Sequence, residues 1–300
     1  MPELAQAETL MRELRSMSVM VVQKNHQIVA WGDVTRRVRV ASVRKSLLSA
    51  LYGIAVADGR IDLDWTLGKL AIGDTAPRLT DLEKTAKIRD LLQARSGVYH
   101  LPAVETEQQS ERRPQRGSHP PGAFWYYNNW DFNALGTIYR RLTGEDIFGA
   151  FERHIAKPIG MQDFSAADGR YVRRAASVHP AYHMHLSARD LARFGVLYLK
   201  KGRWGERQVV PETWVSESTH AHSSINRQLG YGYMWWVSRG DLHLRTRFGK
   251  GAYSARGYGG QLLVVAPAYD LVIVHLTEVS LSDSQTAELL ARILAAAPQQ

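Results

Sequence analysis

Apolar and polar residues follow two different periods along this chain. Near its start, apolar positions at helical spacing predict a helix over about residues 3–16. The short apolar runs 19–22 and 28–30 flank a polar turn at 24–26, which predicts strand, turn and strand. Residues 37–40 alternate between polar and apolar and predict a further short strand.

The helical period returns over residues 42–58. Leu47, Leu51 and Ile54 fall on one stripe of this segment, which predicts a helix. Gly59 follows the last periodic residue, so we expect it to end the helix as a C-cap would.

The middle of the chain, about 64–200, consists mostly of helical segments broken by loops. Thr80 is followed three residues later by Glu83, and this capping box predicts the start of a helix. Residues 108–121 are polar and contain three prolines, so we expect an exposed loop there, near the mouth of any pocket.

Strand-like patterns resume in the last third of the chain. They predict strands at 231–237, 242–246, 257–266 and 271–276, and an alanine- and leucine-rich stretch predicts a final helix over about 284–297.

Strands at both ends and helices between them predict an α/β (α+β) fold. We expect one antiparallel sheet built from both chain ends and flanked by the terminal helices. Residues 1–65 and 200–300 would form this discontinuous sheet domain, and 66–199 an inserted, mostly helical domain. Active sites often lie between such lobes.

The amino-acid composition excludes several kinds of active-site chemistry. The 300 residues favour two domains or one large one, and 45% hydrophobic with 22% charged residues is typical of a globular protein. The absence of cysteine excludes disulfides, cysteine-ligated zinc, iron–sulfur clusters and thiol nucleophiles. The formal net charge of +9 leaves nucleic acid, an acidic surface and an anionic substrate open as partners.

The hydropathy of the chain predicts no membrane segment. Its first residues lack a cationic stretch followed by an apolar core, so we expect no signal peptide. No apolar run reaches the roughly 18 residues that a membrane helix needs. The compartment stays open between the cytoplasm, if the chain is complete, and export, if a leader has been removed.

Several common catalytic motifs are missing from the sequence. It contains no P-loop, no H-E-x-x-H and no G-x-S-x-G, and its glycine-rich stretch 257–260 is followed by Leu262 where a dinucleotide fingerprint has its third glycine. His183 and His185 could both face a metal, but no carboxylate partner is evident. We therefore predict no metal and no cofactor.

Ser42 and Lys45 form an S-x-x-K motif at the start of the predicted helix 42–58. Residues three apart share a helix face, so a lysine that loses its proton in a buried cleft could activate the serine hydroxyl. The backbone N–H of Ser42, near the positive end of the helix dipole, could also stabilise an oxyanion. The alternative is a helix cap followed by a surface cation.

A second motif, Tyr127-x-Asn129, follows about 80 residues later within an aromatic stretch. The tyrosine hydroxyl could carry a proton between nucleophile and leaving group, and the asparagine could hold the lysine and a substrate amide. The alternative is that these aromatic residues pack a core.

A third element, 255–261, is glycine-rich and precedes a strand. Its small residues, Gly257 among them, would let a strand backbone approach a ligand closely. The backbone N–H of Tyr258 could be the second oxyanion donor. The alternative is an ordinary glycine-rich entry to a strand.

In this order and spacing the three motifs resemble the serine β-lactamase and penicillin-binding-protein superfamily. The tyrosine version is similar to class C β-lactamases and to family-VIII esterases, D-aminopeptidases and 6-aminohexanoate-dimer hydrolases. Further matching stretches are GRIDLD at 59–64, IRDLLQARSGV at 88–98, LTG at 142–144, PIGM at 158–161 and LSARDLARFG at 186–195.

This resemblance runs from about residue 19 to 297 and implies a β-lactamase/transpeptidase-like fold. It implies that Ser42 is the acylated nucleophile, that Lys45 and Tyr127 handle its proton, and that Asn129 binds substrate and lysine. Water would then hydrolyse the acyl-enzyme.

The third motif departs from the family pattern, which has Lys-Thr-Gly or His-x-Gly. Ala255 stands in place of the cation or imidazole, followed by Arg256 and Gly257. Arg256 could supply a charge, although strand alternation would turn it to the other face. We therefore expect an esterase or amidase rather than an efficient β-lactamase, with Arg256, Gly257 and Tyr258 as substrate-binding residues. The alternative is a catalytically weak or inactive binding protein of this fold.

We expect a small-molecule substrate and no nucleic-acid partner. Cations such as Arg37 and Arg39 alternate on a predicted strand, and no nucleic-acid-binding motif is present. Five aromatic residues suggest an aromatic-lined cleft, with core packing as the alternative for each: Tyr126, Trp130, Tyr231, Tyr253 and Tyr258. The sequence leaves the oligomeric state open.

Overall fold

The computed structural model describes residues 2–297, and its centre is one antiparallel sheet. Within those residues this sheet has eight strands, in the order β2 (His26–Gly32), β1 (Ser18–Gln23), β14 (Leu271–Leu276), β13 (Gln261–Ala266), β12 (Tyr253–Gly257), β11 (Trp236–Ser238), β10 (Leu229–Tyr231) and β9 (Ser223–Ser224). β1 pairs with β14, Met20 opposite Val274. The predicted sheet built from both chain ends is confirmed.

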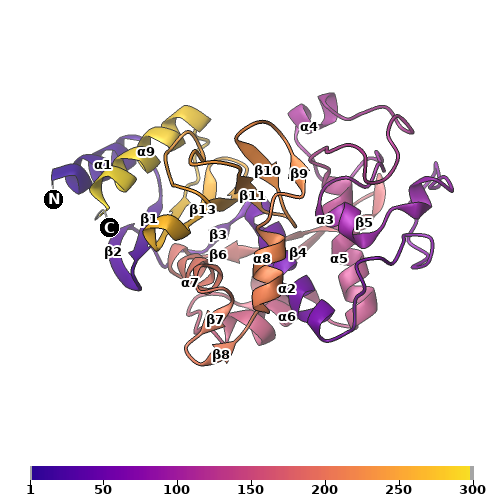
Figure 1. Ribbon diagram of the computed structural model, residues 1–300, viewed down its shortest axis with the longest axis horizontal. Helices are drawn as coiled ribbons and strands as arrows, with labels where there is room; N and C mark the ends of the chain where they lie inside the picture. The colour runs from indigo at the N-terminus through magenta and orange to yellow at the C-terminus, as the bar shows by residue number, and fades with distance from the viewer. Residues whose placement is uncertain (1, 298–300) are drawn as a thin grey trace.

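The terminal helices cover one face of this sheet. α1 (Pro2–Glu13) and α9 (Asp283–Ala296) lie side by side there, with both chain ends close to them (Figure 1). Val19 and Val21 of β1 point into the apolar layer beneath these helices and pack with Ile293. Alternate residues of β1, such as Met20, face the opposite layer, so the strand is buried on both sides and reads as a continuous apolar run.

α7 (Ala188–Leu199) packs on the second face, against β1, β13 and β14. Gly195 permits this close approach, because a Cβ there would lie 2.5 Å from a Val272 methyl and 2.7 Å from one of Leu263. α7 belongs to the segment 66–199, yet its packing partner is the sheet. The division into two domains stays a prediction.

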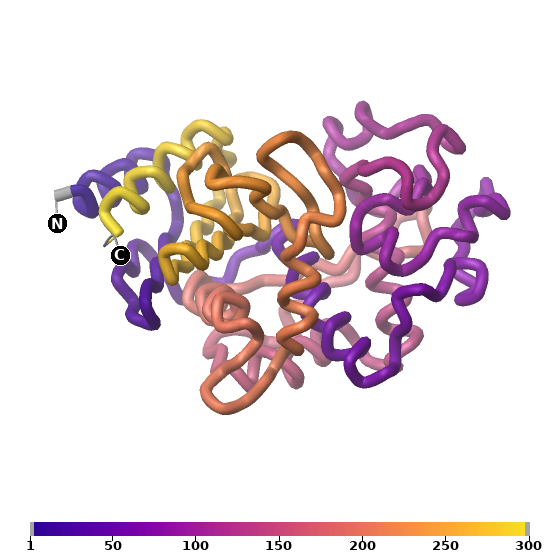
Figure 2. The backbone as a smooth tube through the Cα atoms, viewed as in Figure 1, coloured from indigo at the N-terminus to yellow at the C-terminus, as the bar shows by residue number. Residues whose placement is uncertain are grey.

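The remaining elements lie mostly beyond α7, and Figure 2 shows the middle of the chain at the opposite end of the molecule from the two termini. The helices are α2 (Arg44–Ala57), α3 (Ile88–Leu92), α4 (Glu107–Glu111), α5 (Asn129–Thr143), α6 (Ile147–Phe151) and α8 (Glu212–Ser218). Single helical turns are η1 (Ala41–Val43), η2 (Glu83–Thr85), η3 (Glu152–Ala156), η4 (Ala166–Asp168) and η5 (Pro267–Tyr269). Two-stranded ribbons complete the described part of the fold: β3 (Val38–Arg39) with β6 (His185–Leu186), β4 (Arg170–Arg174) with β5 (Ser177–His183), and β7 (Arg203–Trp204) with β8 (Arg207–Gln208).

The helix predicted to start at Thr80 is wrong. Both capping-box hydrogen bonds form, from Thr80 N to Glu83 Oε2 at 2.7 Å and from Glu83 N to Thr80 Oγ1 at 3.2 Å. Only the 3₁₀ turn η2 follows, because the chain then pairs with residues upstream, Thr66 bridging to Lys87. Tertiary pairing overrides the local helix signal here.

Three of the predicted C-terminal strands also differ. Segment 231–237 divides into β10 and β11, joined by a turn in which Gly232 N donates to the Trp235 carbonyl at 2.9 Å. Segment 242–246 is a tight turn with Leu244 and Arg245 at positive φ. Segment 257–266 splits at its glycines into the end of β12 and β13. Turn chemistry, rather than apolar pattern, sets these boundaries.

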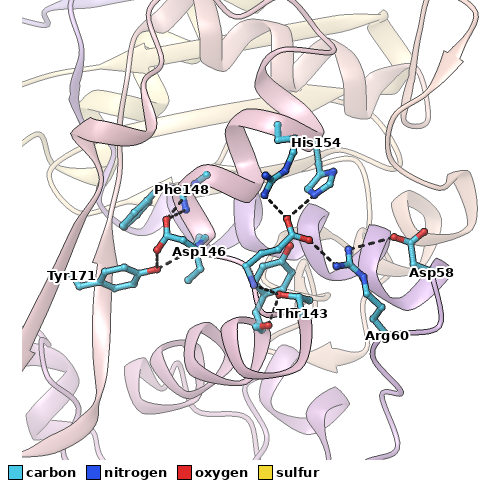
Figure 3. Close-up of polar contacts among 12 residues, drawn as sticks. Asp58, Arg60, Thr143, Asp146, Phe148, His154 and Tyr171 are labelled. Atoms are coloured by element: carbon cyan, nitrogen blue, oxygen red, sulfur yellow. Dashed lines mark hydrogen bonds and ion pairs between the residues drawn. The ribbon is translucent and has the colours of Figure 1, made fainter.

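An ion cluster centred on Glu145 joins the end of α5 to its surroundings, and Figure 3 labels two of its partners, Arg60 and His154. Its carboxylate accepts hydrogen bonds from Arg60 Nη1 at 2.7 Å, Arg153 Nη2 at 2.7 Å and His154 Nε2 at 2.8 Å. Although partial burial opposes ionisation, these donors lower the pKa of Glu145 to about 2. The neighbouring Asp146 caps α6 through the backbone N–H groups of Phe148 and Gly149.

Candidate active site

Ser42 lies in η1, immediately before α2, rather than in the first turn of the α-helix itself. Ala41 precedes it with φ +47°, a left-handed conformation that costs energy for a residue with a side chain. Val40 N donates to the Met184 carbonyl at 3.1 Å and anchors the entry to this turn. The serine is thus presented, half-buried, on a strained corner between β3 and α2.

Lys45 lies in the first turn of α2 and is 1% exposed. Its Nζ donates to Tyr127 Oη and to Asn129 Oδ1, both at 2.7 Å. It also lies 4.0 Å from the ring centre of Tyr127 and 4.2 Å from that of Phe132. Burial, reinforced by the charge of Arg44, lowers the pKa of Lys45 well below its ordinary value. This shift favours the neutral amine, which is the form that can accept a proton.

Tyr127 stands between this amine and the serine. Its phenol interacts with the Ser42 hydroxyl as well as with Lys45 Nζ. Burial raises the pKa of Tyr127 to about 12, although the Ser42 hydroxyl and the charges of Arg44 and Arg256 oppose that rise. The phenol is thus protonated at neutral pH and links nucleophile and amine.

Asn129 is held by the protein through its whole side-chain amide. Oδ1 accepts from Lys45, and Nδ2 donates to the Val104 carbonyl at 2.8 Å and to Gln109 Oε1 at 3.2 Å. Gln109 in turn belongs to the capping box of α4 with Thr106. The geometry connects Asn129 to the lysine, and its predicted contact with a substrate amide stays a prediction.

The end of β12 closes the site from the other side. Gly257 comes so near the Ser42 turn that a Cβ there would lie 2.5 Å from the Val40 carbonyl and 3.2 Å from Ala41 Cβ. Tyr258 follows with its side chain 68% exposed. Only glycine permits this approach, and Tyr258 lines the same pocket as Ser42.

These residues share a pocket of about 400 Å³. Its lining residues are Ser42, Thr106, Gln108, Gln109, Arg112, Trp125, Tyr126, Tyr127, Trp236, Arg256, Gly257, Tyr258 and Asp283. The expectation that 108–121 lies near a pocket mouth therefore fits its first residues, although 107–111 forms the short helix α4. Further along, Arg116 does not face the pocket but pairs with Glu83 at 2.7 Å.

Arg256 lines the pocket in spite of strand alternation. Its side chain leaves β12 on the face opposite Ala255, which is 1% exposed, and its guanidinium then lies over the Trp236 ring at 4.9 Å. Trp236 stacks on Tyr127, with ring centres 5.3 Å apart. Burial lowers the pKa of Arg256 to about 10, so it remains charged at neutral pH.

Sequence reasoning missed two of the aromatic walls, Trp125 and Trp236. Of the five aromatic residues considered for a cleft, only Tyr126 and Tyr258 line the pocket, and Trp130, Tyr231 and Tyr253 are buried in the core. The signal for Trp236 was the turn at 232–235, since that turn places the tryptophan at the start of β11.

A larger pocket of about 940 Å³ lies elsewhere, between the β1–β2 hairpin and α7. Val22, Val196 and Trp204 form part of its apolar lining. None of the predicted site residues reaches it, so volume alone does not identify the active site. Among residues 2–297, no helix is long and apolar enough to cross a membrane.

The chain is similar to known proteins along nearly its whole length. The family model described as Beta-lactamase matches residues 4–297. An uncharacterized protein of Alkalihalophilus pseudofirmus is 27% identical over 263 residues, covering 79% of this chain and 72% of its own. A proposed 6-aminohexanoate-dimer hydrolase from Bacillus anthracis superposes with a TM-score of 0.72 at 21% identity, covering 97% of this chain and 83% of the other. A penicillin-binding protein from Bacillus halodurans superposes with a TM-score of 0.71 at 16% identity, covering 96% and 98%.

Proposed function

The chain belongs to the β-lactamase family, and on that premise we propose that it is a serine hydrolase that forms an acyl-enzyme on ester or amide substrates. The observation that carries the proposal is the continuous contact from Lys45 through Tyr127 to Ser42 at the wall of one pocket. Nucleophile, proton carrier and base are thereby connected, as covalent catalysis by a hydroxyl requires.

In the acylation step, Ser42 Oγ attacks the substrate carbonyl while its proton passes to Tyr127 and from there to the neutral amine of Lys45. The depressed pKa of Lys45 supports its role as proton acceptor. Lys45 then returns the proton through Tyr127 to the leaving alcohol or amine. Hydrolysis of the acyl-enzyme repeats the relay with water as the nucleophile.

The tetrahedral intermediate needs donors for its oxyanion. We assign these to the backbone N–H groups of Ser42, in η1, and of Tyr258, which follows β12, since both residues line the pocket. The close approach of Gly257 to the Val40 carbonyl supports this assignment, because it fixes the distance between the two segments.

We propose esters and simple amides as substrates in preference to β-lactams. Ala255 offers no cation at the strand position that carries one in the family pattern, and it is buried. The walls formed by Trp125 and Trp236 suit an apolar or aromatic substrate group.

The test compares the wild type with Ser42→Ala on p-nitrophenyl esters, aminohexanoate dimer, D-amino-acid amides and nitrocefin. We expect ester or amide hydrolysis that falls by at least about 10³-fold in Ser42→Ala. A fluorophosphonate probe should label the wild type at Ser42, as peptide mass spectrometry would show.

An inactive binding protein of the same fold is the alternative outcome. It would be supported if the probe never labels Ser42, or if Ser42→Ala keeps full ester hydrolysis. Efficient nitrocefin turnover that depends on Ser42 would keep the acyl-enzyme but overturn the preference for esters and amides.

A further inference from the structure

A second pocket, separate from the one that contains Ser42, lies on the sheet face that α7 covers. Its volume is about 940 Å³, and the β1–β2 hairpin, α7 and the β7–β8 ribbon bound it. Small-molecule sites usually have volumes of about 300–1,000 Å³. None of its lining residues lines the Ser42 pocket, so the proposed hydrolysis gives this second pocket no role.

An irregularity in the pairing of β1 with β2 explains why this pocket is hollow. Met20 lies opposite Ala30 and Val22 lies opposite Gln27, with a bulge between the two pairs. In a regular strand residue 28 would share the face of Ala30. Because of the bulge, residues 28–29 both pack in the layer beneath α1 and α9 instead. The pocket side of β2 therefore presents only a methyl group and the side chain of Gln27.

α7 and the β7–β8 ribbon supply an apolar lining. Ala192, Val196 and Leu199 recur at helical spacing along α7, and all three line the pocket. Trp204 of β7 lines it from the ribbon. Val196, Leu199 and Trp204 are only half-buried, so apolar surface faces solvent in the pocket. An aliphatic chain that covered this surface would be stabilised by the hydrophobic effect.

The charged side chains that line the pocket are all cations. Within the part of the chain that the structure describes, no acidic residue lines it. Four of the cations are already paired with an acidic residue: Arg189 with Asp163, Lys200 with Asp270, Lys201 with Glu212, and Arg203 with Glu206. The fifth cation is Arg193.

Arg193 differs from the other four in its contacts. Among residues 2–297, no carboxylate oxygen lies within 4.0 Å of its guanidinium. Its Nη1 donates to the Ile159 carbonyl at 3.3 Å, and its guanidinium lies 5.8 Å from the ring centre of Trp204. These contacts orient the side chain and leave the paired donors Nε and Nη2 available to an anion.

We propose that this pocket binds an aliphatic monocarboxylate, with its carboxylate on Arg193 and its chain along α7. The carboxylate would accept paired hydrogen bonds from Nε and Nη2, and the chain would contact Val196, Leu199 and Trp204. A single anionic group suits a lining whose only unpaired charge, in the described residues, is one guanidinium. The site is separate from Ser42, so this inference goes beyond the proposed function and does not depend on it.

The test is equilibrium dialysis of the wild-type protein against octanoate, decanoate and dodecanoate, each below its micelle-forming concentration. We expect the dissociation constant to fall by about fourfold for each methylene that becomes buried. The neutral 1-decanol keeps the chain without the charge and should bind about tenfold or more weakly than decanoate. Ser42→Ala should bind decanoate as tightly as the wild type does, whether or not the protein is a hydrolase.

Two arginine variants test the contact with the carboxylate. Arg193→Gln should weaken decanoate binding by about tenfold or more but change 1-decanol binding by less than about twofold, a difference that a merely structural loss would not produce. Arg203→Gln is the matched control, because Arg203 lines the same pocket but is paired with Glu206. It should change the binding of either ligand by less than about twofold.

A third variant tests the place of the chain. Ala30 is exposed and lines the pocket, so Ala30→Trp should fill the hollow and weaken decanoate and 1-decanol alike by about tenfold or more. Thermal unfolding identifies any variant that does not fold. If Arg193→Gln is one of them, Ala30→Trp and the comparison of decanoate with 1-decanol decide the proposal.

Several results would overturn the inference. One is no binding of dodecanoate at millimolar concentration, and another is decanoate binding that Arg193→Gln and Ala30→Trp leave unchanged. Decanoate that protects Ser42 from a fluorophosphonate probe equally in the wild type and Ala30→Trp would lie in the catalytic pocket instead. Sedimentation with phosphatidylglycerol vesicles, without binding of monomeric decanoate, would identify a membrane surface rather than a free carboxylate as the partner.

Discussion

Two groups of charged residues in this molecule differ in whether their charges are paired. Around Glu145, one carboxylate receives hydrogen bonds from Arg60, Arg153 and His154, so every charge has a counter-charge. Around Ser42, the amine of Lys45 and the guanidinium of Arg256 have, within residues 2–297, no carboxylate oxygen closer than 4.0 Å. The first arrangement stabilises the fold, and the second carries a stored electrostatic cost.

The pKa shifts of Glu145 and Lys45 show the same difference. The donors around Glu145 lower its pKa, which favours the charged state. Burial lowers the pKa of Lys45, which disfavours the charged state and leaves a base. A group whose charge is well compensated contributes stability, and a group whose charge is suppressed is available for proton transfer. The contrast can be tested by changing one group at a time.

The largest effect is expected from Lys45→Met. Loss of the amine should reduce kcat/KM by about 10³-fold, within the range for removal of a general base. The unfolding free energy should change little, because the lost hydrogen bonds to Tyr127 and Asn129 are offset by relief from burying an ionisable group. Ester hydrolysis and urea unfolding measure the two quantities. A large loss of stability with activity retained would contradict this, because Lys45 would then stabilise the fold rather than serve the reaction.

Glu145→Gln should show the opposite pattern, with activity retained within about twofold and about 2 kcal/mol of stability lost. A carboxyl whose folded pKa lies below its unfolded value contributes stability above the unfolded pKa and loses it as pH falls through the folded one. The wild type should therefore lose this contribution between pH 4.5 and about 2. Equilibrium unfolding at stepped pH checks this, and a variant with the same acid profile as the wild type would contradict it.

The smallest effect is expected from Arg44→Met. Arg44 is 5% exposed, and within the described part of the chain its Nε and Nη1 have no hydrogen-bond partner, so replacement should raise stability by about 1 kcal/mol. Because the charge of Arg44 lowers the pKa of Lys45, its loss should raise that pKa. The acid limb of the kcat/KM profile should then move to higher pH. If the acid limb does not move, the charge of Arg44 does not influence the pKa of Lys45.

Much of the framework follows from local pattern. The strand 271–276 was predicted with its observed bounds, because an uninterrupted apolar run buried on both faces leaves little choice. The spacing of Ser42, Lys45 and Tyr127 predicted a group of residues that the structure brings together, and their catalytic roles stay predictions. Helix periodicity and motif order carry this information within short stretches of sequence.

The features that the sequence did not predict depend on contacts between distant segments. The position of Trp236 depends on a turn that divides an apparent strand, and the capping box at Thr80 yields to pairing between Thr66 and Lys87. Arg256 was predicted as a substrate-binding residue although strand alternation argued against it, and it lines the pocket because alternation does not determine how a long side chain bends at a strand end. His243, in a turn, lies with its Nε2 2.8 Å from Oγ of Ser254 in β12, and no periodicity reveals this contact.

The pairing of β1 with β14 determines when the sheet can form during synthesis of the chain. Gln23 Nε2 donates to the Tyr269 carbonyl across 246 positions of sequence. At synthesis rates of about 5–20 residues per second, β14 is synthesised roughly 12 to 50 seconds after β1. During that interval β1 can pair with the neighbouring strand β2 but not with β14, so the sheet forms late.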